Sequence, residues 1–230
     1  MKKTLGVLGG MGPLATVYFF EKVVLNTDAN CDQEHIHIII ENNTNIPDRT
    51  SYLLGKGDDP VPELIRTAKN LEKLGAEYLA MPCNTAHYFY DDIVREVNIP
   101  FLNMIEETLK YIKEKYKEEK KIGLLATDGT RKMGVYDRYF KGSGIELIAP
   151  EGKYQKNIMD FIYRIKSDLR AAKIDGFNET VQFLKNQGVN VFVLGCTELS
   201  SAYYHFNIKG SFIDPMEILA KKCINFAFEK

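Results

Sequence analysis

Residues 75–85, GAEYLAMPCNT, and residues 188–198, GVNVFVLGCTE, align without a gap at a constant offset of 113. Each segment starts at a glycine that ends a helical stretch, continues as an apolar run typical of a buried strand, and reaches a cysteine. Two shorter echoes flank this pair in the same order, LGVLGG at 5–10 with IGLLAT at 122–127, and FLNMIE at 101–106 with FIDPME at 212–217. Three echoes in one order indicate two related halves.

Short β-rich runs alternate with longer amphipathic stretches in both halves. The runs that we expect to form strands are 4–8, 36–40, 77–81, 122–126, 145–148 and 189–194. The stretches with helical spacing of apolar residues are 62–74, 103–116, 153–170 and 178–186. This alternation predicts an α/β fold in which helices cover both faces of parallel sheets.

Cys83 and Cys196 occupy equivalent positions in the two halves, directly after an apolar run. Open α/β sheets bind their ligands at the C-terminal ends of strands. The residues after each cysteine favour the start of a helix, whose dipole and free N–H groups lower the pKa of a thiol from its reference value of about 8.5. If the halves pack face to face about a pseudo-twofold axis, the two thiols confront each other across one cleft.

Two thiols on opposite sides of one carbon suit inversion of a stereocentre. One thiolate removes a proton from one face, and the other thiol delivers a proton to the opposite face. Next to a carboxylate this reaction builds charge on a group that is already charged, so without an electron-sink cofactor the protein must supply N–H donors and cations. Arg49 is a candidate bidentate clamp for a carboxylate, and a second cation would favour a dicarboxylate substrate. The candidate hydroxyl, amide and N–H donors are Asn84, Thr85, Thr127, Thr130 and Thr197.

Composition excludes several other classes of protein. The 230 residues include 30 Lys+Arg and 31 Asp+Glu, a formal net charge of −1, and no basic block offers a footprint for nucleic acid. No apolar run approaches the roughly 20 residues of a membrane helix. Pro13 interrupts the N-terminal apolar stretch before it could serve as a secretory signal, so we expect a cytoplasmic protein. Four scattered cysteines fit neither a disulfide framework nor a zinc site.

Five motifs occur in one order along the chain: GGMGPLAT at 9–16, IPDRT at 46–50, MPCNTAH at 81–87, ATDGT at 126–130 and LGCTEL at 194–199. Together they resemble the cofactor-independent aspartate/glutamate racemases, over residues 5 to about 217. The resemblance implies an enzyme that interconverts L- and D-aspartate, with glutamate as a further substrate. It also implies that neither pyridoxal phosphate nor a metal is needed.

The resemblance further implies two four-stranded parallel α/β domains related by a pseudo-twofold axis, with the active site in the cleft between them. We expect an N-terminal domain at 1–105, joined by a C-terminal helix at 214–230, and a C-terminal domain at 106–213. Assembly as a homodimer is also implied.

The family's functional residues have matches in this chain. Cys83 and Cys196 match the catalytic pair, and Arg49 and Lys166 resemble the two cations that hold the substrate carboxylates. One departure is Asn103, where family members often carry histidine, and this leaves the hydrogen bonding of that strand end open. The residues that match positions lining the substrate pocket are Met11, Asn84, Thr85, Thr127 and Thr197.

Three further residues of these motifs each have two possible interpretations. His87 either tunes the Cys83 thiol from one helical turn away or packs its own helix. Asp48 either has a structural role, as a turn residue or an orienter of Arg49, or takes part directly in the chemistry. Glu198 either complements the dipole of its helix or holds the ammonium group of the substrate.

Other functions also stay open. GMGPLA at 10–15 formally matches the dinucleotide fingerprint, but the acidic Glu41 lies 31 residues beyond Gly10 instead of about 20. We therefore interpret these glycines as allowing the backbone to approach the substrate closely. The alternatives are a single-cysteine isomerase or decarboxylase of the same superfamily, and a non-catalytic anion-binding or thiol-redox protein. Two intact cysteines and the PDRT motif favour the racemase.

Overall fold

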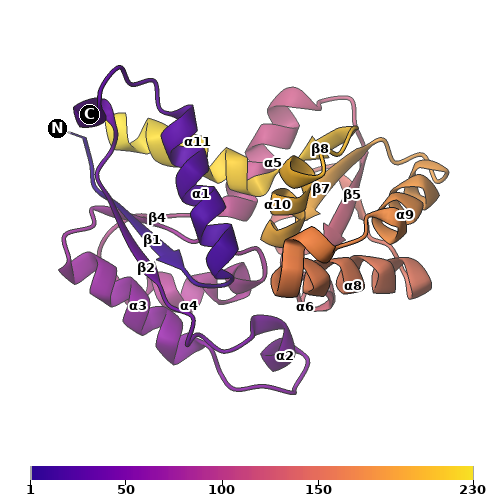
Figure 1. The fold of residues 1–230 in the computed structure, drawn as a ribbon, viewed down its shortest axis with the longest axis horizontal. Coiled ribbons are helices and arrows are strands. Elements are labelled where there is room, and N and C mark those ends of the chain that lie inside the picture. Colours follow the sequence, from indigo (N-terminus) through magenta and orange to yellow (C-terminus); the bar gives the residue numbers. More distant parts are fainter. Residues whose placement is uncertain (1, 230) are drawn as a thin grey trace.

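The computed structural model describes residues 2–229 and contains two four-stranded parallel sheets, which lie side by side in Figure 1. The strand orders are β2-β1-β3-β4 and β6-β5-β7-β8, so the two halves share one topology. This confirms the predicted α/β fold. The strands are β1 (Leu5–Gly9), β2 (Ile38–Asn42), β3 (Tyr78–Ala80), β4 (Phe101–Leu102), β5 (Lys121–Ala126), β6 (Glu146–Ile148), β7 (Val191–Gly195) and β8 (Ser211–Ile213).

The three sequence echoes fall on equivalent strands. The first pair forms β1 and β5, the second β3 and β7, and the third β4 and β8. Every residue of β1 and β7 is buried, as continuous apolar runs in a parallel sheet require. The strand expected at 36–40 lies two residues later, because β1 begins at Leu5 and Leu5 pairs with Ile38.

Helices cover both sheets. Their apolar residues recur at helical spacing, and α3, for example, buries Leu64, Ala68 and Leu71 against the first sheet. The helices are α1 (Pro13–Asn26), α2 (Arg49–Leu53), α3 (Val61–Lys73), α4 (Tyr90–Val94), α5 (Met104–Lys115), α6 (Asp128–Lys132), α7 (Asp137–Phe140), α8 (Gly152–Asp168), α9 (Asp175–Lys185), α10 (Thr197–His205) and α11 (Pro215–Phe228). Short 3₁₀ helices lie at Asp32–Glu34, Thr85–Phe89 and Leu169–Ala171.

The C-terminal helix α11 returns to the first half of the chain. It packs against α1 and α5, and Figure 1 shows it running across the top of the molecule beside them. Its residues Met216, Leu219 and Cys223 belong to the same core cluster as β1. The proposed division at residues 105 and 106 falls in the first turn of α5 and stays a prediction.

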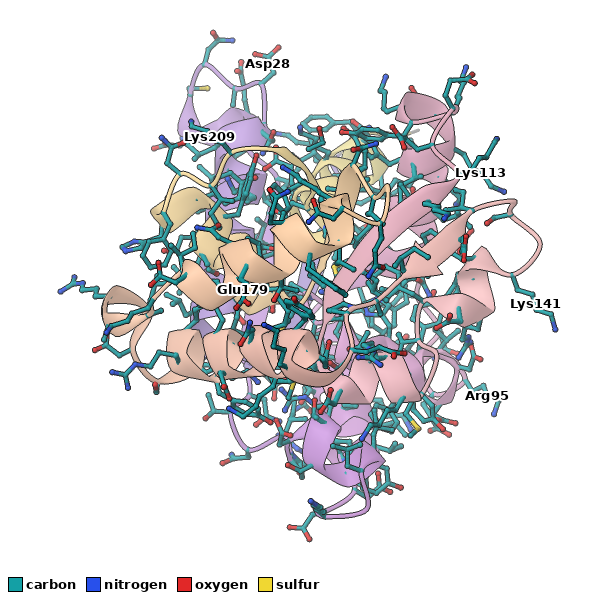
Figure 2. The ribbon with its side chains drawn as sticks, turned by 90° about the vertical axis from the view of Figure 1, so that its right-hand side faces the viewer. Asp28, Arg95, Lys113, Lys141, Glu179 and Lys209 are labelled. Carbon is teal, nitrogen blue, oxygen red and sulfur yellow. The ribbon has the colours of Figure 1, made fainter. Side chains whose placement is uncertain are left out.

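The outer surface carries many of the charged residues. Figure 2 labels six of them, all exposed and projecting from the body of the molecule: Asp28, Arg95, Lys113, Lys141, Glu179 and Lys209. Among residues 2–229, none of the helices has the length and apolar character needed to cross a membrane.

Candidate active site

One small cavity, of ≈ 10 Å³, is lined by both Cys83 and Cys196. Residues from both halves form its wall, so the cavity lies where the halves meet. A larger hollow of ≈ 370 Å³ beside α5 and α11 contains neither cysteine. The small cavity is lined by all the residues predicted as catalytic or substrate-binding, together with three others: Met11, Asp48, Arg49, Thr50, Cys83, Asn84, Thr85, Thr127, Lys166, Cys196, Thr197 and Glu198.

Cys83 follows β3 after a tight turn, in which its backbone N–H donates to the carbonyl of Met81 at 2.8 Å. The helix expected to begin at this cysteine is different in the structure. A five-residue 3₁₀ helix begins at Thr85, flanked by Asn84, and α4 follows it directly. Such tighter turns are frequent at the N-terminal ends of α-helices. Cys83 therefore lies just before the helix.

His87 is fully buried and does not line the cavity. Its Nδ1–H donates to the carbonyl of Cys83 at 2.8 Å, and its Nε2 accepts from the backbone N–H of Met104 at 3.1 Å. Burial lowers the pKa of His87 to about 4, so the ring is neutral and has one donor and one acceptor. His87 thus connects the backbone of Cys83 to the start of α5, and its hydrogen bond is to the carbonyl and not to the thiol.

Asn103 caps α5. Its Oδ1 accepts from the backbone N–H groups of Ile105 and Glu106, both at 3.0 Å, and its Nδ2 donates to the Tyr139 hydroxyl at 2.7 Å. The departure from histidine at this position therefore leaves the helix start with a complete cap.

Cys196 flanks the N-terminus of α10, as the sequence predicted. Its thiol donates a hydrogen bond to Oε2 of Glu198 at 2.8 Å. Burial, followed by the negative charge of Glu198, raises the pKa of Cys196 well above its ordinary value. The expected lowering of this pKa at the helix start is therefore wrong, because burial and the carboxylate outweigh the charge of Lys166 and the backbone N–H of Glu198. At neutral pH, Cys196 is therefore a protonated thiol, and its S–H is hydrogen-bonded to the Glu198 carboxylate.

Lys166, from α8, lies between two carboxylates. Its Nζ is 4.0 Å from Oε1 of Glu198 and 4.0 Å from Oδ2 of Asp48. Burial alone lowers the pKa of Lys166, but the neighbouring negative charge, above all that of Glu198, more than offsets this effect and the pKa is raised. Lys166 is therefore a cation at the cavity wall, close to the acceptor of the Cys196 proton.

Asp48 caps the short helix α2, and its Oδ1 accepts from the backbone N–H of Ser51 at 2.7 Å. Burial opposes ionisation, yet this hydrogen bond and the charge of Lys166 lower the pKa of Asp48 below its ordinary value. Asp48 thus forms the turn before α2 and contributes a negative charge beside Lys166.

Arg49 is 7% exposed, and backbone carbonyls hold its guanidinium. Nη1 donates to Ile46 at 3.2 Å and to Pro47 at 2.9 Å, and Nη2 donates to Met11 at 3.3 Å. Within residues 2–229, its Nε has no hydrogen-bond partner and no carboxylate lies at ion-pair distance from the guanidinium. The arginine is thus a rigidly held cation whose Nε–H is unused, which is suited to a bound anion.

Three hydroxyl groups form a closed set across the two halves. The Oγ1 atoms of Thr85 and Thr127 are 3.1 Å apart, those of Thr85 and Thr130 2.8 Å, and those of Thr127 and Thr130 3.0 Å. Thr127 also caps α6 by accepting from the backbone N–H of Thr130. Thr85 and Thr127 line the cavity, and Thr130 supports them from behind it.

The glycines of the N-terminal loop have two different surroundings. Gly10 has a φ of 93°, and a Cβ there would lie 2.4 Å from the carbonyl carbon of Asn43. Because Gly10 has no side chain, the backbone after β2 packs closely against it. The group that approaches this glycine is therefore Asn43 and not a substrate, contrary to our interpretation of the glycines. Gly12 faces the site, since a Cβ there would contact Oε1 of Glu198 at 3.6 Å.

Sequence analysis missed Tyr136. This buried residue precedes α7, and its hydroxyl donates to Oδ1 of Asn84 at 2.5 Å. No motif includes it, because the two residues are 52 positions apart and lie in different halves.

Taken together, the cavity holds a thiol from each half, two cations, two carboxylates and several hydroxyl or N–H donors. Among residues 2–229, no group of three or more His, Cys, Asp or Glu side chains is arranged to hold a metal ion. The fold and the site define a class of two-domain α/β proteins with paired thiols in the interdomain cavity.

Comparisons with known proteins identify the family. The Asp/Glu/Hydantoin racemase family model matches residues 8–223. The chain belongs to this family and is an amino-acid racemase.

Individual relatives agree with this assignment. A structure of Picrophilus torridus aspartate racemase has 31% identity and a TM-score of 0.87, covering 99% of this chain and 95% of that one. The broad specificity amino-acid racemase RacX of Bacillus subtilis is 28% identical over 228 residues, 96% of each chain. Francisella tularensis glutamate racemase in complex with D-glutamate shares the fold, with 20% identity, a TM-score of 0.70, and coverage of 99% of this chain and 81% of that one.

Proposed function

We propose that this protein interconverts L- and D-aspartate by a cofactor-independent, two-base mechanism. The observation that carries the proposal is that Cys83 and Cys196, one from each half, line the same buried cavity as Arg49 and Lys166. The 31% identity with an aspartate racemase supports aspartate as the substrate.

The two thiols have different surroundings, and this suggests their starting roles. In the resting site the Cys196 thiol keeps its proton and donates a hydrogen bond to Glu198, so Cys196 is the proton donor to the substrate. Cys83, as the thiolate, removes the α-proton from the opposite face of the substrate. Afterwards Cys83 carries the proton and Cys196 is the thiolate, ready for the reverse reaction. The positive charge of Lys166, 4.0 Å from Glu198, stabilises the thiolate form of Cys196.

The cations and donors bind the two carboxylates of the substrate. Arg49 offers its free Nε–H, and Asn84 offers an Nδ2 that has no partner among residues 2–229. Negative charge builds on the α-carboxylate as the proton leaves, so donors fixed in advance lower the barrier. Thr85, Thr127 and Thr197 complete this set. The scheme requires neither pyridoxal phosphate nor a metal ion.

The acyclic dicarboxylates aspartate and glutamate differ by one methylene, which is worth about 1–3 kcal/mol in a pocket. Aspartate is therefore the main proposed substrate, and glutamate is a second one. The relative RacX is described as a broad specificity enzyme. A panel of aspartate, glutamate and alanine would measure how narrow this site is.

The decisive experiment follows D/L conversion by circular dichroism, with a chelator present and no added cofactor. We expect Cys83→Ala and Cys196→Ala each to abolish racemisation, while Cys31→Ser, at an exposed position, serves as the matched control. Near-wild-type rates in either active-site variant would defeat the two-base scheme. Racemisation in heavy water must also place deuterium on the α-carbon of aspartate.

Two rival functions give different results. A single-cysteine isomerase or decarboxylase would leave the aspartate pool unlabelled by deuterium. A thiol-redox protein would form a reversible disulfide between Cys83 and Cys196, which thiol titration would detect.

The assembly and location are also proposals. We expect a homodimer, and α1 offers an exposed apolar surface at Leu14, Val17 and Leu25 for such a contact. Sedimentation equilibrium would measure the molecular mass in solution. Cell fractionation would test the expected cytoplasmic location.

A further inference from the structure

We propose that Tyr136 is a positioning residue whose hydroxyl orients the side-chain amide of Asn84, so that the Asn84 NH₂ group is available to a substrate carboxylate. The inference rests on the proposed function, because it assigns one of the donors of that site to an anionic substrate. Tyr136 itself does not line the cavity.

Tyr136 is held in place by its surroundings. It has no exposed surface, its ring lies 5.9 Å from that of Phe140, and both residues belong to the core cluster of the second half. A close-packed aromatic side chain has little freedom to move. Its hydroxyl is therefore a fixed point against which Asn84 is oriented.

The hydrogen bond from Tyr136 also determines the orientation of the Asn84 side-chain amide. Burial, with smaller contributions from Asp214 and Cys196, raises the pKa of Tyr136 well above its ordinary value, so the phenol keeps its proton and donates it. Oδ1 of Asn84 accepts this proton at 2.5 Å. The flipped amide would instead present Oδ1 to the cavity, where it would repel a carboxylate.

The other end of the amide is left without a partner. Asn84 is 1% exposed, and its buried Nδ2 makes no hydrogen bond to any of residues 2–229. A buried donor that lacks an acceptor destabilises the folded protein. Asn84 lies between Cys83 and Thr85 in the cavity wall, so an anionic substrate beside the thiol is the natural acceptor.

The bond crosses the junction between the halves. Asn84 follows β3 of the first sheet, whereas Tyr136 precedes α7 in the second half. The hydroxyl contact of Thr85 with Thr127 crosses the same junction. The donor is therefore aimed only when the halves are in contact, as they are in this structure.

The kinetic test is a double-mutant cycle on aspartate racemisation. We expect Asn84→Ala to lower kcat/KM about 100-fold and Tyr136→Phe to lower it about 10-fold. The loss is larger in kcat than in KM, because the carboxylate gains charge in the transition state. We expect the double variant, with Asn84→Ala and Tyr136→Phe, to have the same kcat/KM as Asn84→Ala alone. Tyr78→Phe is the control, since this buried hydroxyl donates to the Cys223 carbonyl at 2.8 Å and Tyr78 does not line the cavity.

Losses that multiply in the double variant would show that Tyr136 acts independently of Asn84 and would overturn the inference. So would a Tyr136→Phe variant that is no less active than Tyr78→Phe. Asn84→Asp keeps the acceptor for Tyr136 but puts an oxygen where the NH₂ group was, so we expect it to lose at least as much activity as Asn84→Ala. Wild-type activity in Asn84→Asp would contradict the assignment.

A measurement without turnover separates this inference from the proposed function. The side-chain NH₂ signals of Asn84 in a ¹⁵N–¹H NMR spectrum are identified by their loss in Asn84→Ala. We expect them to shift in Tyr136→Phe and not in Tyr78→Phe, and unchanged signals in Tyr136→Phe would overturn the positioning role. If the wild-type protein racemises none of the amino acids tested, the proposed function fails, and these signals still decide the role of Tyr136.

Discussion

The thiol of Cys196 donates a hydrogen bond of 2.8 Å to the carboxylate of Glu198 at the start of α10. The bond favours the thiol, because the carboxylate would repel a neighbouring thiolate. Lys166 lies 4.0 Å from the other carboxylate oxygen and offsets part of this repulsion. Glu198 thus determines how readily Cys196 gives up its proton.

Replacement of Glu198 by glutamine keeps an acceptor and removes the charge. Since the negative charge raises the pKa of Cys196, its loss lowers that pKa. We expect the alkaline limb of kcat/KM, in the direction in which Cys196 donates the proton, to move to lower pH in Glu198→Gln. Glu217→Gln is the control, because Glu217 is a half-buried carboxylate that accepts from Tyr204 outside the cavity. An unmoved limb would mean that Glu198 does not act on Cys196.

Arg49→Lys preserves the charge and removes the planar fork. A lysine cannot reproduce donation to the carbonyls of Ile46, Pro47 and Met11 while also presenting an N–H to the substrate. We expect the KM for aspartate to rise at least about 10-fold. Initial rates over a range of aspartate concentrations measure it, with the exposed Arg66→Lys as the control. An unchanged KM would remove Arg49 from the binding set.

Lys166→Met tests the second carboxylate contact. We expect the inhibition constant of succinate, an unreactive dicarboxylate, to rise about 10-fold or more, because a cation at the cavity wall is lost. Lys156→Met is a matched control, since Lys156 lies on the same helix and pairs with Asp160 in solvent. Equal inhibition constants in wild type and Lys166→Met would assign the second carboxylate to other groups.

The buried His87 makes stability depend on pH. Burial lowers its pKa to about 4 in the folded state, against a reference of about 6.5 when unfolded. The unfolded chain therefore binds a proton first as the pH falls. The free energy of unfolding decreases from about pH 6.5 towards pH 4, by up to about 3 kcal/mol, and levels off below that.

Urea unfolding at several pH values measures this effect. In His87→Gln, we expect the free energy of unfolding to decrease less between pH 6.5 and 4 than in the wild type. The variant is less stable at neutral pH, because the hydrogen bonds to Cys83 and Met104 are altered. Parallel pH profiles for the two proteins would mean that His87 does not titrate in this way.

Much of the architecture was predictable from local pattern. Apolar runs that follow a glycine and lead to a cysteine, repeated at an offset of 113, predict that Cys83 and Cys196 lie at the ends of β3 and β7. Strand ends, helix stripes and turn residues follow from side chains that are near one another in the chain, so spacing reports them directly. The edge strand β2 lies two residues later than expected, because its register is set by the pairing of Ile38 with Leu5 and local pattern does not report pairing.

The surroundings of the cysteines were not predictable in this way. The helix after each cysteine suggested a lowered thiol pKa, but the depth of burial and the carboxylate of Glu198 raise the pKa of Cys196. The close approach of Asn43 to Gly10 and the bond from Tyr136 to Asn84 join segments that are distant in sequence. Desolvation and long-range contacts exist only after the halves have packed together. Chain pattern thus located the reactive groups, whereas three-dimensional packing set their protonation and orientation, because both depend on neighbours that spacing along the chain does not encode.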